Sequence, residues 1–382
     1  MKKRNYLKIG FAFLLLLVIV SCNKDKDKAK ELAPAEAKVE VRSASQQITT
    51  NMDQVMNTPG VLSINYLGTL MGFESWKSTL KQLVFQTGNL SLGKVKDAFR
   101  THAFGNNRED GVGEYGIYEY NFQTGEFDQT GTSTTMLKLL FPASAVAESN
   151  MTNNGEFIAD NLLYTTITYT DTYWDDYLQN WVTETYEEKI PTNIDLNLKV
   201  DNAVQATGNY SGSYSSNGTP TSINVSITMA PYTFVMGMSG SGTNYSTNLT
   251  FKQSGTELMG YDMDVAYSSN METVDKISGY YHISPLKVEG WMNYSDIDDH
   301  MIGVEEGTIA NYDLDFLNSQ ISLTLFQTVL NATIGTLEFK MYTDPQYGDT
   351  YPMIAVVYSD GTSDWLENIM NDTSYKFGKH RK

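Results

Sequence analysis

The chain has 382 residues, a formal net charge of −18 and a single cysteine. A surface this acidic repels phosphate backbones, so the composition argues against nucleic-acid binding. One cysteine cannot form a disulfide within the chain, so stability must come from a packed core. Aromatic residues make up 12% of the chain, mostly tyrosine, and this composition favours strands over helices.

The first 21 residues have the three parts of a secretory signal peptide. Lys2–Arg4 is basic, Ile9–Val20 is apolar, and the small residue Ser21 ends the segment. The apolar run is shorter than the roughly 20 residues that a membrane-spanning helix needs. We therefore predict that residues 1–21 are removed during export.

The four residues Ile19-Val20-Ser21-Cys22 resemble the lipobox of bacterial lipoproteins. The resemblance implies cleavage before Cys22 and acylation of this cysteine, with chains such as palmitate. Each buried methylene contributes about 0.8 kcal/mol, so more than one acyl chain anchors a protein stably. The expected location is the outer membrane of a Gram-negative envelope, on its periplasmic or its surface-exposed side. An ordinary cleaved signal with an incidental cysteine is the alternative.

The lipidated cysteine and the residues after it, 22–47, are predicted to form a flexible tether. Asn23–Lys28 mixes lysine with aspartate and has no apolar side chain to bury, and the stretch that follows is rich in Ala, Glu and Lys. We treat residues 48–382 as one β-rich domain held from the membrane by this tether.

Residues 48–104 are predicted to form the helical part of that domain. Ile48, Met52 and Val55 recur at helical spacing, and Pro59-Gly60 ends the pattern. Three more helix candidates follow, at 61–71, 74–86 and 94–104. Their apolar sides must be buried, so we expect these helices to pack against one face of the sheet that follows.

From residue 113 to 382 the pattern alternates with the period of strands. Ile194, Leu196 and Leu198 are separated by polar residues, and Asn217-Gly218 is a hairpin signature between two such runs. Short strands joined by tight turns, without helices between them, predict a mainly β (α+β) fold. The expected architecture is a large antiparallel β-meander, curved into a half-barrel or folded into two packed sheets.

Several short segments carry a resemblance: 116–121, 124–127, 140–143, 191–192 with 196–201, 217–222, and 358–362 with 366–367. They are similar to segments of uncharacterised Bacteroidota cell-envelope lipoproteins. The resemblance covers most of the chain after the signal peptide and implies the location and a β-rich fold, with no known activity.

One predicted hairpin carries a candidate ligand-binding site at its tip. Trp174, Tyr177 and Trp181 are interleaved with Asp175 and Asp176. Exposed rings beside carboxylates could stack on sugars and accept hydrogen bonds from their hydroxyls. The alternative is that the rings only clamp the two strands together.

Motifs for catalysis or for metal binding are not evident, and we predict no catalytic residue, no metal and no cofactor. The four histidines have no metal-ligand spacing, although His300 follows three aspartates that could bind a hard cation. Asp262/Asp264 and Asp313/Asp315 are each spaced to face one side of a strand. Methionines such as Met259 and Met263 could line an apolar cavity or pack in a core.

The sequence therefore predicts a non-enzymatic envelope lipoprotein that binds an apolar ligand, a glycan or a partner protein. Besides the membrane, its partners would be that ligand or an envelope protein, and no nucleic acid. A carboxylate-based envelope hydrolase and a structural or adhesive surface protein without a small ligand are the alternatives.

Overall fold

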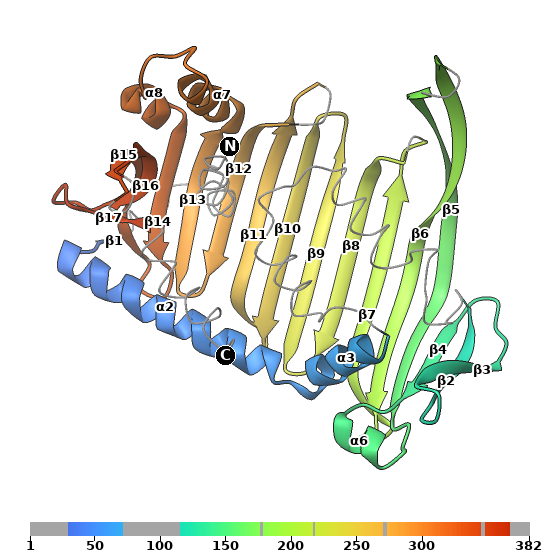
Figure 1. Ribbon diagram of the computed structural model, residues 1–382. Coiled ribbons are helices and arrows are strands. Elements are labelled where there is room, and N and C mark those ends of the chain that lie inside the picture. The colour runs from blue at the N-terminus through green and yellow to red at the C-terminus, as the bar shows by residue number, and fades with distance from the viewer. Residues whose placement is uncertain are drawn as a thin grey trace. The chain divides into compact units, whose positions relative to one another are not determined.

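The computed structural model describes residues 30–71, 115–175, 179–216, 218–269, 273–344 and 348–366. Strands make up 57% of this part of the chain, and helices are few (Figure 1). The prediction of a mainly β fold is therefore confirmed. The described residues group into two compact units: unit 1 contains 30–56 and 242–366, and unit 2 contains 57–71 and 115–241.

Unit 1 is built on a meander in which each strand pairs antiparallel with the next. One short strand, β1, pairs parallel with β15. The strands are β1 (Lys30–Glu31), β10 (Asn244–Gln253), β11 (Thr256–Tyr267), β12 (Val274–Ile283), β13 (Leu286–Asn293), β14 (Ile321–Gln327), β15 (Ala332–Thr343), β16 (Thr350–Val357) and β17 (Ser363–Trp365).

The sheet of unit 1 has two different faces. On β12, for example, Ile277 and Tyr281 are buried, whereas Tyr280 and His282 on the other side are partly exposed. This alternation follows from the period of two in a strand. The side that we call the apolar face carries Tyr245, Leu249, Tyr261, Met263, Ile277, Tyr281, Val288, Leu323, Leu337 and Phe339, all of which are buried.

Helix α2 (Pro34–Met56) packs on unit 1, and this overturns most of the predicted tether. Ala37, Val41 and Ala44 are almost completely buried. Glu40 accepts a hydrogen bond from the Gln327 side chain at 2.8 Å. A side formed by two alanines and a valine looks weakly apolar in sequence, but small side chains allow a helix to approach its partner closely. Residues 30–47 are thus a short strand, a two-residue connection and the first part of a helix.

Two short helices, α7 (Tyr294–Glu305) and α8 (Leu314–Ser319), connect β13 to β14. Helix α7 contacts β12, and it buries Ile297 and Met301 completely or nearly so. Helix α8 contacts β14 and β15. The two helices therefore close one end of the unit 1 strands (Figure 1).

Unit 2 begins with helix α3 (Pro59–Leu70), which contacts β7. Proline at the first helical position fits a helix start, so Pro59 begins α3 and α2 ends before it. The helices predicted at 74–86 and 94–104 lie outside the described residues. The other elements are β2 (Gly116–Asn121), β3 (Glu126–Gly131), β4 (Leu137–Phe141), α6 (Ala145–Ser149), β5 (Gly155–Asp175), β6 (Asn180–Val200), β7 (Ala203–Tyr214), β8 (Pro220–Met229) and β9 (Tyr232–Ser241).

The strands of unit 2 also pair mostly antiparallel, with one parallel pair, β2 and β4. Turn residues act as expected: Asp201 and Asn202 both have positive φ, and so does Gly218 at the Asn217-Gly218 hairpin. The core gathers where β2, β4 and β5 meet α3, around Leu67, Tyr120, Leu139 and Phe141.

The β5–β6 hairpin extends past its neighbours (Figure 1). Strand β4 pairs only with 155–159 of β5, and β7 only with 193–200 of β6. Beyond a bulge at 160–163, residues 164–175 and 180–191 pair with each other, and among the described residues they have no other strand partner. We call these two segments the ribbon.

Candidate functional site

The predicted site at the hairpin tip falls on the end of the ribbon. Trp174 pairs with Trp181, and Asp175 pairs with Asn180, as a hairpin requires. Asp176 and Tyr177 lie outside the described residues. The Trp181 side chain is 63% exposed. Hairpin formation is therefore confirmed, and ligand binding at this tip stays a prediction.

A second set of aromatic and acidic side chains lies on the face of unit 1 opposite the apolar face. In the middle of this set, Asp262 of β11 pairs with Tyr280 of β12, and Tyr280 pairs in turn with Glu289 of β13. Asn248 of β10 and Thr324 of β14 extend the same row at its two ends. We call the side of β10–β14 that carries this row the polar face.

The neighbouring row adds a second large ring. Trp291 of β13 pairs with Ser278 of β12, which pairs with Asp264 of β11. The Lys276 ammonium lies 5.1 Å from the centre of the Trp291 ring, within cation–π range. Trp291 and Tyr280 occupy diagonal positions on adjacent strands, where long side chains come within reach of each other. Both rings are only partly exposed.

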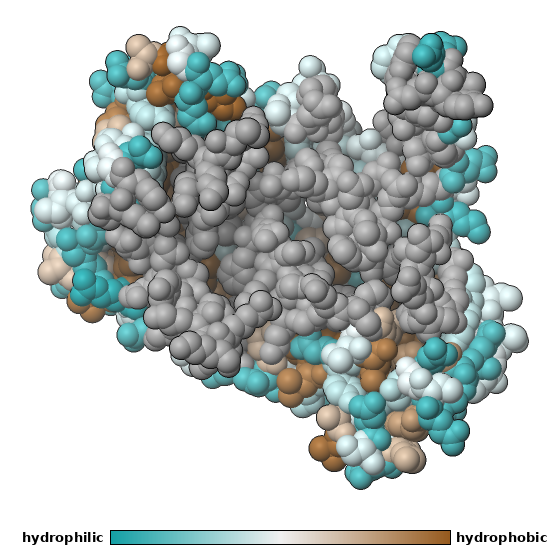
Figure 2. Space-filling view, viewed as in Figure 1, coloured by the Kyte–Doolittle hydropathy of each residue, from teal (hydrophilic) through white to brown (hydrophobic). Residues whose placement is uncertain are grey.

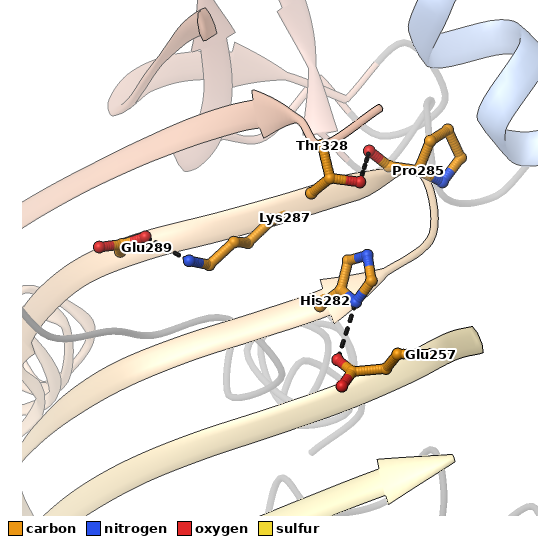
Figure 3. Close-up of polar contacts among 6 residues, drawn as sticks. All are labelled: Glu257, His282, Pro285, Lys287, Glu289 and Thr328. Atoms are coloured by element: carbon orange, nitrogen blue, oxygen red, sulfur yellow. Dashed lines mark hydrogen bonds and ion pairs between the residues drawn. The ribbon is translucent and has the colours of Figure 1, made fainter. Parts of the chain in front are cut away.

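On the other side of Tyr280, a histidine–glutamate hydrogen bond and a lysine–glutamate ion pair hold the polar side chains in place (Figure 3). His282 Nδ1 lies 2.9 Å from Glu257 Oε1, and Lys287 Nζ lies 2.5 Å from Glu289 Oε2. Gly260 makes the first pair possible, because a Cβ there would come within 2.7 Å of the Glu257 carboxylate.

The environment of Tyr280 determines its hydrogen-bonding role. Burial, and after it the negative charges of Glu257, Asp262 and Glu289, raise the pKa of Tyr280 above 10.0. Its hydroxyl therefore stays protonated at neutral pH and can donate a hydrogen bond. The Lys287 ammonium lies 4.5 Å from the ring centre, so one side of the ring is already in contact with a cation.

Two polar atoms near this row are buried without a hydrogen-bond partner among the described residues: His282 Nε2 and the Tyr281 hydroxyl. The His282 side chain is 13% exposed and belongs to the polar face. Tyr281 belongs to the apolar face, where burial raises the pKa of its hydroxyl. Only the histidine nitrogen is on the side of Tyr280.

Two glycines support the row from the other face. Gly279 of β12 pairs with Gly290 of β13, and their φ angles are +146° and +147°, which L-residues with side chains rarely adopt. A Cβ at either position would clash with a backbone carbonyl of the adjacent strand, that of Asp262 or Ser322. A side chain at Gly279 would therefore keep β12 from lying as close to β11 as it does, and a side chain at Gly290 would do the same for β13 and β14.

The α7–α8 connection forms a hollow of about 620 Å³, lined by His300, Ile309, Tyr312 and Asp313, among others. Its main polar groups already have structural roles. His300 Nε2 accepts a hydrogen bond from the Asp313 backbone N–H at 3.0 Å, and the Asp313 carboxylate caps α8 by accepting from the Phe316 N–H. Figure 2 shows hydrophobic residues among hydrophilic ones at this end of unit 1.

The carboxylates singled out in the sequence separate into different environments. Asp262 and Asp264 lie on one side of β11 as expected, and Asp264 accepts a hydrogen bond from Ser246 at 2.5 Å. Asp313 and Asp315 were expected on a strand, but they start helix α8 because Asp313 is a good N-cap. Within the described ranges, no group of three or more His, Cys, Asp or Glu side chains could hold a metal ion.

Sequence reasoning did not identify Tyr280, His282 or Glu289, although a signal for them was present. Residues 277–283 and 286–292 alternate, and the short turn between them pairs Ile283 with Leu286. This register alone places Tyr280 opposite Glu289. What the sequence does not show is that Asp262, from the strand before, completes the row.

Comparison with protein-family models, with curated proteins and with solved structures finds nothing that matches this chain. In the part of the chain that the structure describes, no helix combines the length and the apolar character needed to cross a bilayer.

Proposed function

We propose that this chain is a non-enzymatic envelope lipoprotein that binds a glycan across its polar face. The observation that carries the proposal is the row in which Asp262 and Glu289 lie on either side of Tyr280, with Trp291 in the next row.

This combination of groups suits the chemistry of a sugar ring. A pyranose has apolar C–H faces, which pack on aromatic rings, and a rim of hydroxyls, which donate hydrogen bonds to carboxylates. Tyr280 and Trp291 supply the rings, and Asp262 and Glu289 supply hydrogen-bond acceptors on the same face of the sheet. An extended glycan also fits the polar face of a sheet better than a compact apolar ligand does, since the latter needs an enclosing cavity.

Two methionines of β11 support a glycan over an apolar ligand. Met259 and Met263 are only 7% and 4% exposed, and they lie among other buried side chains of the apolar face. They are therefore filled core positions in this structure. The hollow at α7–α8 has charged and polar side chains in its lining, which also disfavours a greasy ligand.

The anchoring part of the proposal rests on the lipobox resemblance at Cys22. An acylated cysteine would hold the glycan-binding face in the envelope, where polysaccharides are abundant. Replacing Cys22 by serine is expected to release the protein from membranes. Retention of Cys22→Ser in membranes after a high-salt wash would contradict the anchor.

Glycan binding is tested with the full acylated chain in detergent. The first step is an array of bacterial, host and plant glycans, followed by titration calorimetry with the best binder. Tyr280→Ala is expected to weaken binding by about tenfold or more, as for a central aromatic contact. Tyr280→Phe should recover most of that loss, because it keeps the ring and removes only the hydroxyl.

Trp181→Ala on the ribbon is the matched control, because it removes an exposed ring from unit 2. Its affinity should equal that of the wild type. If Trp181→Ala abolishes binding and Tyr280→Ala does not, the binding site lies at the hairpin tip. If no glycan on the array binds, the proposed function is wrong.

A further inference from the structure

The turn between β14 and β15 presents two exposed apolar side chains. Val329 is 75% exposed and Leu330 is 51% exposed, and they are adjacent in a four-residue turn, 328–331. Single exposed apolar residues are common on protein surfaces, but an adjacent pair at the tip of a turn is less readily explained by chance.

Hydrogen bonds hold this turn in a fixed conformation. The Thr328 backbone N–H donates to the Pro285 carbonyl at 2.8 Å. The Thr328 hydroxyl donates to the same carbonyl at 3.0 Å (Figure 3). The Leu330 N–H donates to the Gln327 side chain at 2.9 Å, and that side chain donates in turn to Glu40 of α2. The turn backbone that carries these two exposed apolar side chains is therefore held in place by hydrogen bonds.

The beginning of the described chain lies beside the same turn. Strand β1 runs parallel to β15, and Lys30 pairs with Ala332, the first residue after the turn. The Leu32 N–H then donates to the Thr333 carbonyl at 2.9 Å. The chain thus enters unit 1 at the end of β15 that carries Val329 and Leu330.

The distance from this point to the proposed anchor is short. Cys22 precedes Lys30 by eight residues, which span at most about 28 Å when fully extended. The tether predicted from sequence was roughly three times as long. Because β1 and α2 shorten it, the turn cannot be far from the membrane that holds the acyl chains.

We propose that the β14–β15 turn inserts Val329 and Leu330 into the interfacial region of the bilayer in which Cys22 is anchored. This inference rests on the anchoring by Cys22 that is part of the proposed function. We identify the occupant as a lipid bilayer, because the short segment between Cys22 and Lys30 keeps the turn close to the membrane that holds the acyl chains. Interfacial apolar side chains reach about 5–10 Å into the boundary between headgroups and acyl chains.

Such a contact would fix the orientation of unit 1. Helix α7 follows β13 and lies at the opposite end of β14 from the turn, because Met292 of β13 pairs with Ile321, the first residue of β14. Seven residues of β14 separate the two ends by about 23 Å. The turn would therefore face the membrane, and α7 would face away from it.

The test measures membrane depth at one introduced cysteine at a time. Cys22 is the only natural cysteine, and acylation blocks its sulfur, so an added cysteine is the single free thiol. The full acylated chain with Val329→Cys carries an environment-sensitive fluorophore and is placed in vesicles of phosphatidylethanolamine and phosphatidylglycerol. Ile302→Cys on α7, which replaces an apolar residue that is 40% exposed, is the matched control.

We expect the label at 329 to shift to shorter wavelength in vesicles and to be quenched by lipid-borne quenchers at least about twofold more than the label at 302. Equal emission and quenching at both positions would overturn the inference while leaving the anchor intact. A blue shift at 329 without lipid quenching would indicate a protein contact and would also overturn it. A chain without acyl groups on Cys22 would overturn the anchor and this inference together.

Discussion

The polar face and the ribbon carry similar side chains on strands with different support. On the polar face, Tyr280 and Trp291 lie on strands that are flanked on both sides, and both rings are partly buried. On the ribbon, Trp181 pairs with Trp174 across a two-stranded ladder and remains 63% exposed. The same residue types are therefore partly buried and held in place where strands flank them on both sides, and exposed to solvent where they do not.

This difference bears on how each region could bind. A ring held between neighbours has already lost its rotamer freedom, so binding a ligand requires little further ordering. A ring at the end of a two-stranded ladder must be ordered when the ligand binds. The comparison therefore favours the polar face as a preformed site, and the ribbon as an adaptable one.

The largest expected loss of stability is in unit 1, on strand β13, which has a neighbouring strand on each side. In Gly290→Ala, the new Cβ would clash with the Ser322 carbonyl of the adjacent strand, in a backbone conformation that alanine rarely adopts. We expect the free energy of unfolding to fall by roughly 3–5 kcal/mol. Urea unfolding followed by tyrosine and tryptophan fluorescence measures this change.

Gly255→Ala provides the control, because Gly255 also has positive φ but no atom beyond its two chain neighbours lies within 4 Å of the place that a new methyl group would take. It should cost only about 1–2 kcal/mol, from the backbone conformation alone. Equal losses for the two variants would mean that the close approach of β13 and β14 is not a requirement of the sheet.

A smaller loss of stability is expected at residues 155–159 of β5, which pair with β4 on one side and with β6 on the other. Glu156 of β5 forms ion pairs with Lys138 of β4 at 2.5 Å and with Lys199 of β6 at 2.7 Å. Hydrogen bonds from Lys138, and next from Lys199, lower the pKa of Glu156 below 4.5. Glu156→Gln is expected to reduce stability at pH 7 by about 1 kcal/mol.

The pH dependence gives this prediction a specific sign. A carboxyl group whose pKa is lowered in the folded state stabilises that state above its unfolded pKa, and the stabilisation is lost as the pH falls through the folded pKa. The wild type and Glu156→Gln should therefore differ at pH 7 and converge once the pH is well below 4.5. A constant difference across that range would contradict the role of the ion pairs. Glu126→Gln, at an exposed position of β3, should change little at either pH.

The smallest effect is expected on the ribbon itself. Trp181→Ala removes one member of a cross-strand pair and should lower stability by less than about 1 kcal/mol. Trp291→Ala on the polar face should cost more, roughly 2 kcal/mol, because its ring is partly buried and contacts Lys276. Amide hydrogen exchange would locate the change, in 180–191 for the first variant and in β12–β14 for the second. A larger loss for Trp181→Ala would reverse the comparison.

Local patterns in the sequence predicted the parts of the fold that depend on local physics. Alternation gave the strands, Asp201-Asn202 and Asn217-Gly218 gave turns, and Pro59 gave the break between two helices. The start of α2 was missed because Ala37 and Ala44 bury little area, and the charged residues between them resemble a solvated linker.

The candidate site depends on pairings that local patterns do not contain. Glu257 comes close to His282 only because β11 lies beside β12 in a particular register and Gly260 leaves room. The positive φ of Gly279 and Gly290 likewise has no signature beyond the glycines themselves. Each of these features arises from neighbouring strands rather than from neighbouring residues.

The ribbon has a consequence for how this protein can diverge. Among the described strands, residues 164–175 and 180–191 pair only with each other. Two residues can therefore be added to or removed from each segment without changing the pairing of any other described strand, provided that Ile167 and Ile190, which lie close to Gly218, keep their places. A change of two per strand also keeps every remaining side chain on its original face. Homologues could therefore differ in hairpin length in even steps, while the strands at its root keep a constant length.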